Sequence, residues 1–156
     1  MKRTKRTIAL VAHDNMKIDL AEWVDWNCKI LLDYRLVCTG TTGRIVAQTL
    51  ADRHGKIEEL MDNITLLKSG PLGGDQQLGS LISQGEIYAL FFFWDPMQAQ
   101  PHDVDVKALL RIATLYNIPT AFNRTTADYM ISSPLFGSDY EPVVKDYKSY
   151  IERSLK

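Results

Sequence analysis

Short apolar runs alternate with segments of helical periodicity along this chain, and that alternation constrains its fold more than any other feature. Strand-like runs cover residues 7–12, 36–39, 64–68, 89–94 and 118–122. The intervening segments repeat apolar residues at three- and four-residue steps, as helices with one buried face do, and they cover about 16–32, 45–53, 76–83, 104–116 and 123–131, with a terminal helix from about 146. The pattern predicts a three-layer, doubly wound α/β fold: a mainly parallel sheet of about five strands with helices on both faces.

Length and composition predict one globular domain over residues 1–156. Hydrophobic residues make up 46% of the chain, and the formal net charge of −1 argues against a nucleic-acid partner. The basic residues of segment 1–6 are interpreted as a solvated tail. No apolar run has the length of a membrane span or of an export signal, so no membrane partner and a cytoplasmic location are expected. Cys28 and Cys38 lack metal-ligand spacing and are predicted to be reduced and packed.

The stretch SGPLGGDQQ, residues 69–77, follows the third strand and precedes a helix. Three glycines and a proline predict a tight turn at the carboxyl edge of the sheet, where open α/β folds bind ligands. Asp75 is the one ionisable residue in that turn. Two interpretations stay open for it: a catalytic carboxylate, or a cap of the following helix.

The stretch TGTTG, residues 39–43, follows the second strand with three hydroxyls and two glycines ahead of a helix. Backbone N–H groups at a helix start, together with hydroxyls, favour phosphate binding. The stretch matches neither GxGxxG nor GxxxxGK[ST], so nothing indicates a dinucleotide or a nucleoside triphosphate. Threonines also occur at helix starts without a ligand. Lys17, four residues after His13, either faces the same anion or is an ordinary exposed helix lysine.

Ionisable side chains also follow the first and fourth strands. His13 and Asp14 come after the first, and His102 lies in the acidic segment from Asp95 to Asp105 after the fourth. Because the carboxyl ends of parallel strands share one edge, these turns are predicted to converge on one active-site crevice. A metal site built from these groups is chemically possible, but no compact ligand motif supports it. His54 is interpreted as a surface residue.

Several segments then match a known family. These are IALVAHDNMK (8–17), CTGTTGR (38–44), SGPLGGDQQLGSLIS (69–83), FFFWDP (91–96) and PHDVDVKALLR (101–111). Together they resemble the methylglyoxal synthase family, and the likeness runs from about Thr7 to the last helix.

The resemblance implies a phosphate lyase that converts dihydroxyacetone phosphate into methylglyoxal and inorganic phosphate. It implies no metal and no organic cofactor, a homohexamer, and Asp75 as the base with His102 at the substrate carbonyl. The implied phosphate and substrate contacts are His13, Lys17, Thr39, Gly40, Thr41, Thr42, Ser69 and Gly70. Supporting acids would be Asp14, Asp95 and Asp105. Product phosphate would fit the same site and inhibit.

The match has small departures, at Arg44, Val104, Asn15 and Met16, and the terminal Arg153 matches a family arginine associated with a neighbouring subunit. For His102, the nearby Asp103 and Asp105 are expected to fix the ring tautomer. Two rival functions remain open. One is a small-effector or phosphate-binding regulatory domain of the same fold without catalysis, and the other is a metal-dependent phosphohydrolase using His13, Asp95 and His102.

Overall fold

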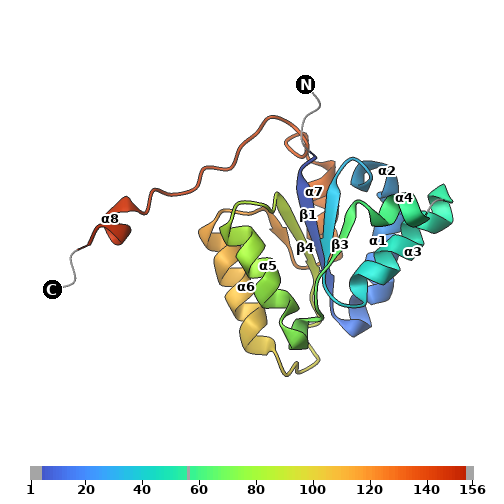
Figure 1. Cartoon of the computed structure of the whole chain (residues 1–156), viewed down its shortest axis with the longest axis horizontal. Coiled ribbons are helices and arrows are strands. Elements are labelled where there is room, and N and C mark those ends of the chain that lie inside the picture. The colour runs from blue at the N-terminus through green and yellow to red at the C-terminus, as the bar shows by residue number, and fades with distance from the viewer. Residues whose placement is uncertain (1–4, 56, 154–156) are drawn as a thin grey trace.

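The computed structural model describes residues 5–55 and 57–153, and a five-stranded parallel sheet lies at its centre (Figure 1). The strands are β1 (Thr7–Ala12), β2 (Arg35–Cys38), β3 (Ile64–Leu66), β4 (Ala89–Phe93) and β5 (Thr120–Ala121). They are arranged in the order β3-β2-β1-β4-β5. The chain therefore winds outward from β1 in one direction and then crosses to β4 on its other side. This confirms the doubly wound α/β prediction.

Two layers of helices cover the sheet, and Figure 1 shows α5 and α6 on one side and α1, α3 and α7 on the other. The helices are α1 (Lys17–Trp26), α2 (Cys28–Leu31), α3 (Thr42–His54), α4 (Ile57–Met61), α5 (Gly74–Ser83), α6 (Asp103–Leu115), α7 (Arg124–Ser132) and α8 (Lys148–Ile151), with short 3₁₀ turns η1 (Asp14–Met16) and η2 (Gly70–Leu72).

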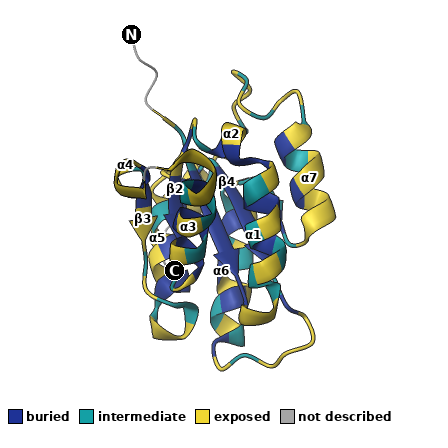
Figure 2. Cartoon of the chain, turned by 90° about the vertical axis from the view of Figure 1, so that its right-hand side faces the viewer, coloured by how far each residue is buried: buried dark blue, intermediate teal, exposed yellow. Residues whose placement is uncertain are grey.

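Strand residues supply both cores because successive side chains point to opposite faces. Ile8 and Phe91 belong to the core under α1, α3 and α7, whereas Ala9 and Phe92 belong to the core under α5 and α6. All four are fully buried. The buried strands form the dark interior of Figure 2. Strands buried on both faces explain why the sequence reads as nearly continuous apolar runs.

Some element boundaries differ from the prediction. The expected helix over 16–32 is interrupted at Asn27, whose side-chain amide donates to the Trp23 carbonyl at 2.9 Å and so competes with helix continuation. Helix α4 was not predicted. Strand β3 is shorter than the predicted 64–68 run, lies at the sheet edge and exposes Thr65 and Leu66.

The N-terminal segment makes contacts that the sequence analysis did not predict. The sequence predicts a solvated tail over residues 1–6. Lys5 Nζ instead donates to the Leu32 carbonyl, and Arg6 donates to the Ser138 carbonyl and lies over the Tyr88 ring. Lys2 and Arg3 lie outside the described residues.

The C-terminal arm, residues 139–153, runs past the end of α6, and α8 lies away from the layers (Figure 1). Within the described residues, no helix is long and apolar enough to cross a membrane.

Candidate active site

A cavity of about 100 Å³ opens at the carboxyl ends of the strands, beside the point where the chain crosses from one side of β1 to the other. Open α/β sheets bind ligands at this position. The turns after β1, β2 and β3 and the segment before α6 all contribute to its wall. The lining residues are Val11, Ala12, His13, Asp14, Lys17, Thr39, Gly40, Thr41, Thr42, Ser69, Gly70, Pro71, Asp75, Gln100 and His102.

Asp75 lies in the first turn of α5 and is 3% exposed. Its Oδ2 is buried, has no hydrogen-bond partner among the described residues, and lies 3.7 Å from His102 Nε2. Burial raises the pKa of this carboxyl; His102 opposes the shift, and the negative charge of Asp105 adds to it. Gly73 is the N-cap of α5, and no side chain caps that helix. The helix-cap interpretation of Asp75 is therefore wrong.

Gly70 makes the close approach of Asp75 and His102 possible. A Cβ at this position would lie 2.6 Å from His102 Nε2 and 3.3 Å from Asp75 Oδ2. The first distance is shorter than real side-chain contacts, so any larger residue would displace the imidazole. The glycine in the turn is thus explained by packing against the histidine and carboxylate.

His13 ends the buried run of β1 and is held from two sides. Its backbone N–H donates to the Phe93 carbonyl, and its ring Nδ1 accepts the Asp95 backbone N–H at 3.1 Å. A backbone N–H can only donate, so Nδ1 carries no proton and the neutral ring carries its hydrogen on Nε2. Burial, followed by the nearby His102, lowers the pKa of His13 and favours this neutral form. Nε2 is buried and has no hydrogen-bond partner in the part of the chain that the structure describes, which leaves it available as a donor to a ligand.

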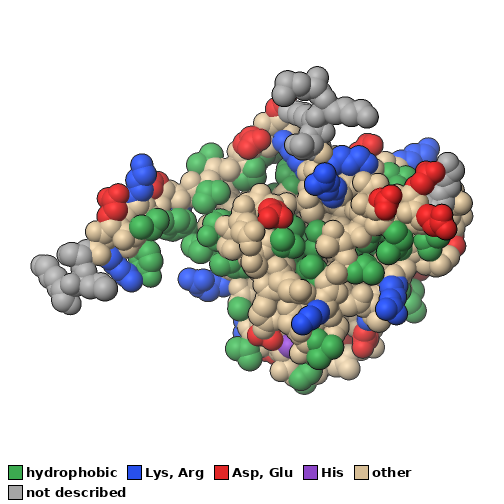
Figure 3. Space-filling view, in the orientation of Figure 1, with side chains coloured by type: hydrophobic (Ala, Val, Ile, Leu, Met, Phe, Trp, Pro, Cys, Tyr) green, Lys and Arg blue, Asp and Glu red, His purple; other side chains and the backbone are tan. Residues whose placement is uncertain are grey.

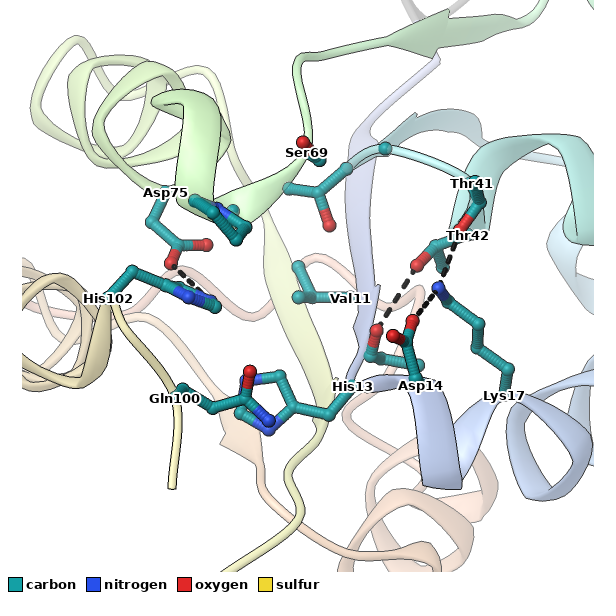
Figure 4. Close-up of a pocket in the computed structure, with 15 residues that line it drawn as sticks. Val11, His13, Asp14, Lys17, Thr41, Thr42, Ser69, Asp75, Gln100 and His102 are labelled. Carbon is teal, nitrogen blue, oxygen red and sulfur yellow. Dashed lines mark hydrogen bonds and ion pairs between the residues drawn. The ribbon is translucent and has the colours of Figure 1, made fainter. Parts of the chain in front are cut away.

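The opposite side of the cavity carries the cation and the hydroxyls (Figure 4). Lys17 Nζ donates to Asp14 Oδ1 and to Thr41 Oγ1. The Lys17 side chain is 20% exposed, so the interpretation as an ordinary exposed helix lysine is wrong. The Gly40 N–H is already bonded to the carbonyls of Leu67 and Lys68, so it holds the turn together and is not free for an anion.

The side chains of this site do not form a metal centre. Among the described residues, no group of three or more His, Cys, Asp and Glu side chains is arranged to hold a metal ion. Asp95 faces Asn15 and its own turn through its carboxylate, and only its backbone meets His13. The donor set expected for a metal-dependent phosphohydrolase is therefore not assembled here.

Comparison with known proteins gives the same family from sequence and from structure. The family model for the MGS-like domain matches residues 20–122. The chain is 53% identical to a methylglyoxal synthase from Maridesulfovibrio salexigens, with 96% of this chain and 98% of the relative covered, and 50% identical to one from Coxiella burnetii strain RSA 493, with 96% and 98% covered. A crystal structure of methylglyoxal synthase from Elizabethkingia anophelis superposes with a TM-score of 0.83 at 44% identity, covering 97% of this chain and 93% of that one.

The chain belongs to the methylglyoxal synthase family. It is therefore an enzyme, a lyase that acts on a small molecule.

The residues that the methylglyoxal synthase resemblance implied lie around this one cavity, with two exceptions. Asp95 and Asp105 do not line the cavity. Asp95 donates its backbone N–H to the cavity residue His13, and the negative charge of Asp105 adds to the raised pKa of Asp75. His102 Nδ1 is buried and has no hydrogen-bond partner within residues 5–55 and 57–153. The expectation that Asp103 and Asp105 fix the His102 tautomer is therefore wrong. Asp103 instead pairs with Lys107, one turn along α6.

Gln100 lines the cavity and was missed by the sequence reasoning. Its only signal was a polar amide two residues before His102 in a segment without regular structure.

Arg44 is exposed on α3 and does not line the cavity, and His54 is exposed as predicted. Arg153 stacks over Tyr150 in the C-terminal arm. Cys28 and Cys38 are buried free thiols, as predicted.

Proposed function

We propose that this enzyme converts dihydroxyacetone phosphate into methylglyoxal and inorganic phosphate through an enediolate, with Asp75 as the general base. The observation that carries the proposal is the buried Asp75 carboxylate, which faces His102 in a cavity whose other side offers Lys17 and threonine hydroxyls. A carboxylate base, imidazole donors and an anion site are the three parts that this reaction needs.

The first step transfers a proton from the hydroxyl-bearing carbon beside the substrate carbonyl to Asp75. A carboxylate with an ordinary pKa is a weak base for a C–H bond. Burial raises the pKa of Asp75, which makes it a stronger base than an exposed aspartate. The remaining barrier is lowered where donors stabilise the enediolate oxygen.

His102 and His13 are the proposed donors to that oxygen. Their rings lie perpendicular with centroids 5.8 Å apart, so the two imidazoles can approach one oxygen from different directions. A neutral His13 with its hydrogen on Nε2 donates without first taking up a proton. This leaves Asp75 as the group that changes protonation state in the first step.

The second step breaks the bond between carbon and the phosphate oxygen, and its electron pair leaves with the phosphate. The remaining enol is an isomer of methylglyoxal, and it becomes methylglyoxal by taking up a proton on carbon and losing its hydroxyl proton. Elimination requires the breaking bond to stand perpendicular to the enediolate plane, whereas a bond in that plane favours return of the proton and isomerisation. We propose that the 39–43 turn, with Lys17, Ser69 and Gly70, holds the phosphate out of that plane.

Thr41→Ala tests this geometric role. The hydroxyl of Thr41 accepts a hydrogen bond from Lys17, so its loss frees the lysine from one of its two anchors. We expect weaker substrate binding and a larger share of proton exchange with solvent relative to elimination, measured by deuterium uptake into recovered substrate. Weaker binding with an unchanged share would contradict the angle argument.

The family resemblance also supports a homohexamer, no cofactor, a cytoplasmic location, and inhibition by inorganic phosphate bound in the same cavity. These extend the proposal beyond the cavity itself. Each follows from the resemblance. The subunit number, the cofactor content and the inhibition are testable with the purified chain, and the location by cell fractionation.

Incubation of the enzyme with dihydroxyacetone phosphate in excess EDTA tests the proposed function. We expect methylglyoxal and inorganic phosphate in equal amounts. Release of phosphate without methylglyoxal, or loss of turnover caused by the chelator, would favour the metal-dependent phosphohydrolase. Binding of phosphate without any turnover would favour the regulatory domain.

A further inference from the structure

The turn after β1 and the loop after β4 are joined by a hydrogen bond that the proposed reaction does not yet use. Asn15 Nδ2 donates to Asp95 Oδ2 at 2.8 Å and also to Gln98 Oε1 at 3.1 Å. The other Asp95 oxygen, Oδ1, accepts the Met97 backbone N–H at 2.9 Å. Both carboxylate oxygens of Asp95 therefore have separate donors, and the residue is 7% exposed.

The same Asp95 residue presents its backbone N–H to His13 Nδ1 at 3.1 Å. This bond is what sets the neutral ring to carry its hydrogen on Nε2. The segment between β4 and α6 has no regular structure, so the strand ladder does not hold the Asp95 backbone in place. Its side-chain bonds to Asn15 and Met97 do so instead.

We propose that Asn15 is a positioning residue that acts through Asp95 to hold His13 in the tautomer that donates from Nε2 into the cavity. The expected effect of His13 Nε2 on activity rests on the proposed function, whereas the tautomer of His13 does not depend on it. An outer hydrogen-bond partner that fixes an imidazole tautomer commonly changes activity by about tenfold or more when it is lost.

The amide of Asn15 suits this role better than a carboxylate would. Asp95 accepts and cannot donate when ionised, so its partner must supply an N–H or O–H. Both the Met97 N–H and the Asn15 amide lower the pKa of Asp95 and keep it ionised. A carboxylate at position 15 would place a second negative charge against it.

The test compares Asn15→Asp with Gln98→Ala in the full chain. The first removes the donor to Asp95 with little change in shape. The second removes the other side-chain partner of the same amide and leaves in place the Gln98 backbone, which also bonds to Asp95. The readouts are the ¹⁵N shifts of the imidazole nitrogens above pH 6.5, and kcat and KM for dihydroxyacetone phosphate. The chain has three histidines, so the ring signals are few.

We expect wild type and Gln98→Ala to show His13 with hydrogen on Nε2 alone. In Asn15→Asp we expect a mixture of both tautomers and a kcat lower by about tenfold, with KM changed less than about twofold. An unchanged His13 tautomer in Asn15→Asp would overturn the proposal, whether or not the melting temperature falls. An equal tautomer change in Gln98→Ala would also overturn it.

The proposed function can fail separately. If the wild-type enzyme forms no methylglyoxal, the proposed reaction is wrong, while the ring nitrogen shifts still report whether Asn15 controls the His13 tautomer.

Discussion

Asp75 places a carboxylate in a position that costs folding stability. Its Oδ2 is buried and has no hydrogen-bond partner among the residues that the structure describes, and burial raises its pKa above the ordinary 3.8. A raised pKa in the folded state means that folding favours the protonated form. The stability from protonated Asp75 is present below pH 3.8 and is lost as pH rises through the folded pKa. At neutral pH the ionised group is therefore destabilising.

Asp75→Asn is accordingly expected to melt at a higher temperature than wild type at pH 7. The amide keeps the shape and removes the buried charge, and each kcal/mol gained corresponds to roughly 2–4 °C for a chain of this size. The gain should shrink as the pH is lowered from 7 to 4, because this change moves toward the raised pKa of the wild-type carboxyl. Melting curves at both pH values measure it. A lower melting temperature at pH 7 would contradict the conclusion that the buried, ionised Asp75 carboxylate destabilises the folded protein.

Gly70→Ala tests the close packing of the reactive pair. The added Cβ would lie 2.6 Å from His102 Nε2, so the imidazole must move away from Asp75. A displacement of about 1 Å in a catalytic group is expected to lower kcat/KM by roughly 10²-fold. The matched control is Gly79→Ala on α5, where a Cβ meets Ile112 at an ordinary 3.8 Å.

Gly79→Ala should leave kcat/KM unchanged and stabilise the helix by about 0.5–1 kcal/mol. If Gly70→Ala retained full activity, the tight contact between the turn and His102 would have no catalytic consequence. If both variants lost activity equally, the loss would not be specific to the contact between position 70 and His102.

At the scale of the element, α7 offers a stability change that is separate from the site. Asn123 is its N-cap, and its side chain accepts the Thr126 N–H at 2.9 Å. Asn123→Ala should lower the free energy of unfolding by about 1 kcal/mol, measured by urea denaturation. Because neither α7 nor Asn123 lines the cavity, kcat should stay at the wild-type value. A loss of activity without a loss of stability would contradict this separation.

The elements themselves were predictable where periodicity was strong. β1 and β4 read directly from apolar runs because parallel strands buried on both faces admit few polar residues. The break at Asn27 was not predictable, since an asparagine within a periodic segment shows its effect only when its amide reaches a backbone carbonyl. The two-residue β5 was overpredicted because its apolar neighbours Ile118 and Phe122 pack against the core without joining the ladder.

At the scale of the whole molecule, the sequence predicted the convergence of the turns but not their hydrogen bonding. Residues 39–43 and 69–75 meet at one cavity because the parallel sheet brings strand ends to one edge. The Asp95 N–H to His13 bond joins residues 82 positions apart through a backbone atom, so no side-chain pattern indicates it. The assignment of residues 1–156 to one domain stays a prediction.

The exposed apolar side chains of the C-terminal arm predict a contact between copies of the chain. Val143, Tyr150 and Ile151 are 81%, 61% and 76% exposed, and hydrophobic side chains are visible along the arm in Figure 3. Exposed apolar side chains on one projecting segment favour burial against another copy. We expect light scattering to give the mass of six 17.7 kDa chains, and deletion of residues 147–156 to give a smaller species. An unchanged mass after the deletion would exclude the deleted residues as an assembly contact.

The role of Asp75 as the base is decided by the turnover of dihydroxyacetone phosphate in Asp75→Asn, with inorganic phosphate binding measured on the same folded sample. We expect methylglyoxal formation to fall by about 10²–10⁴-fold while the Kd for phosphate changes little, because the base is lost and the anion site is kept. Turnover close to that of wild type would contradict this role for Asp75.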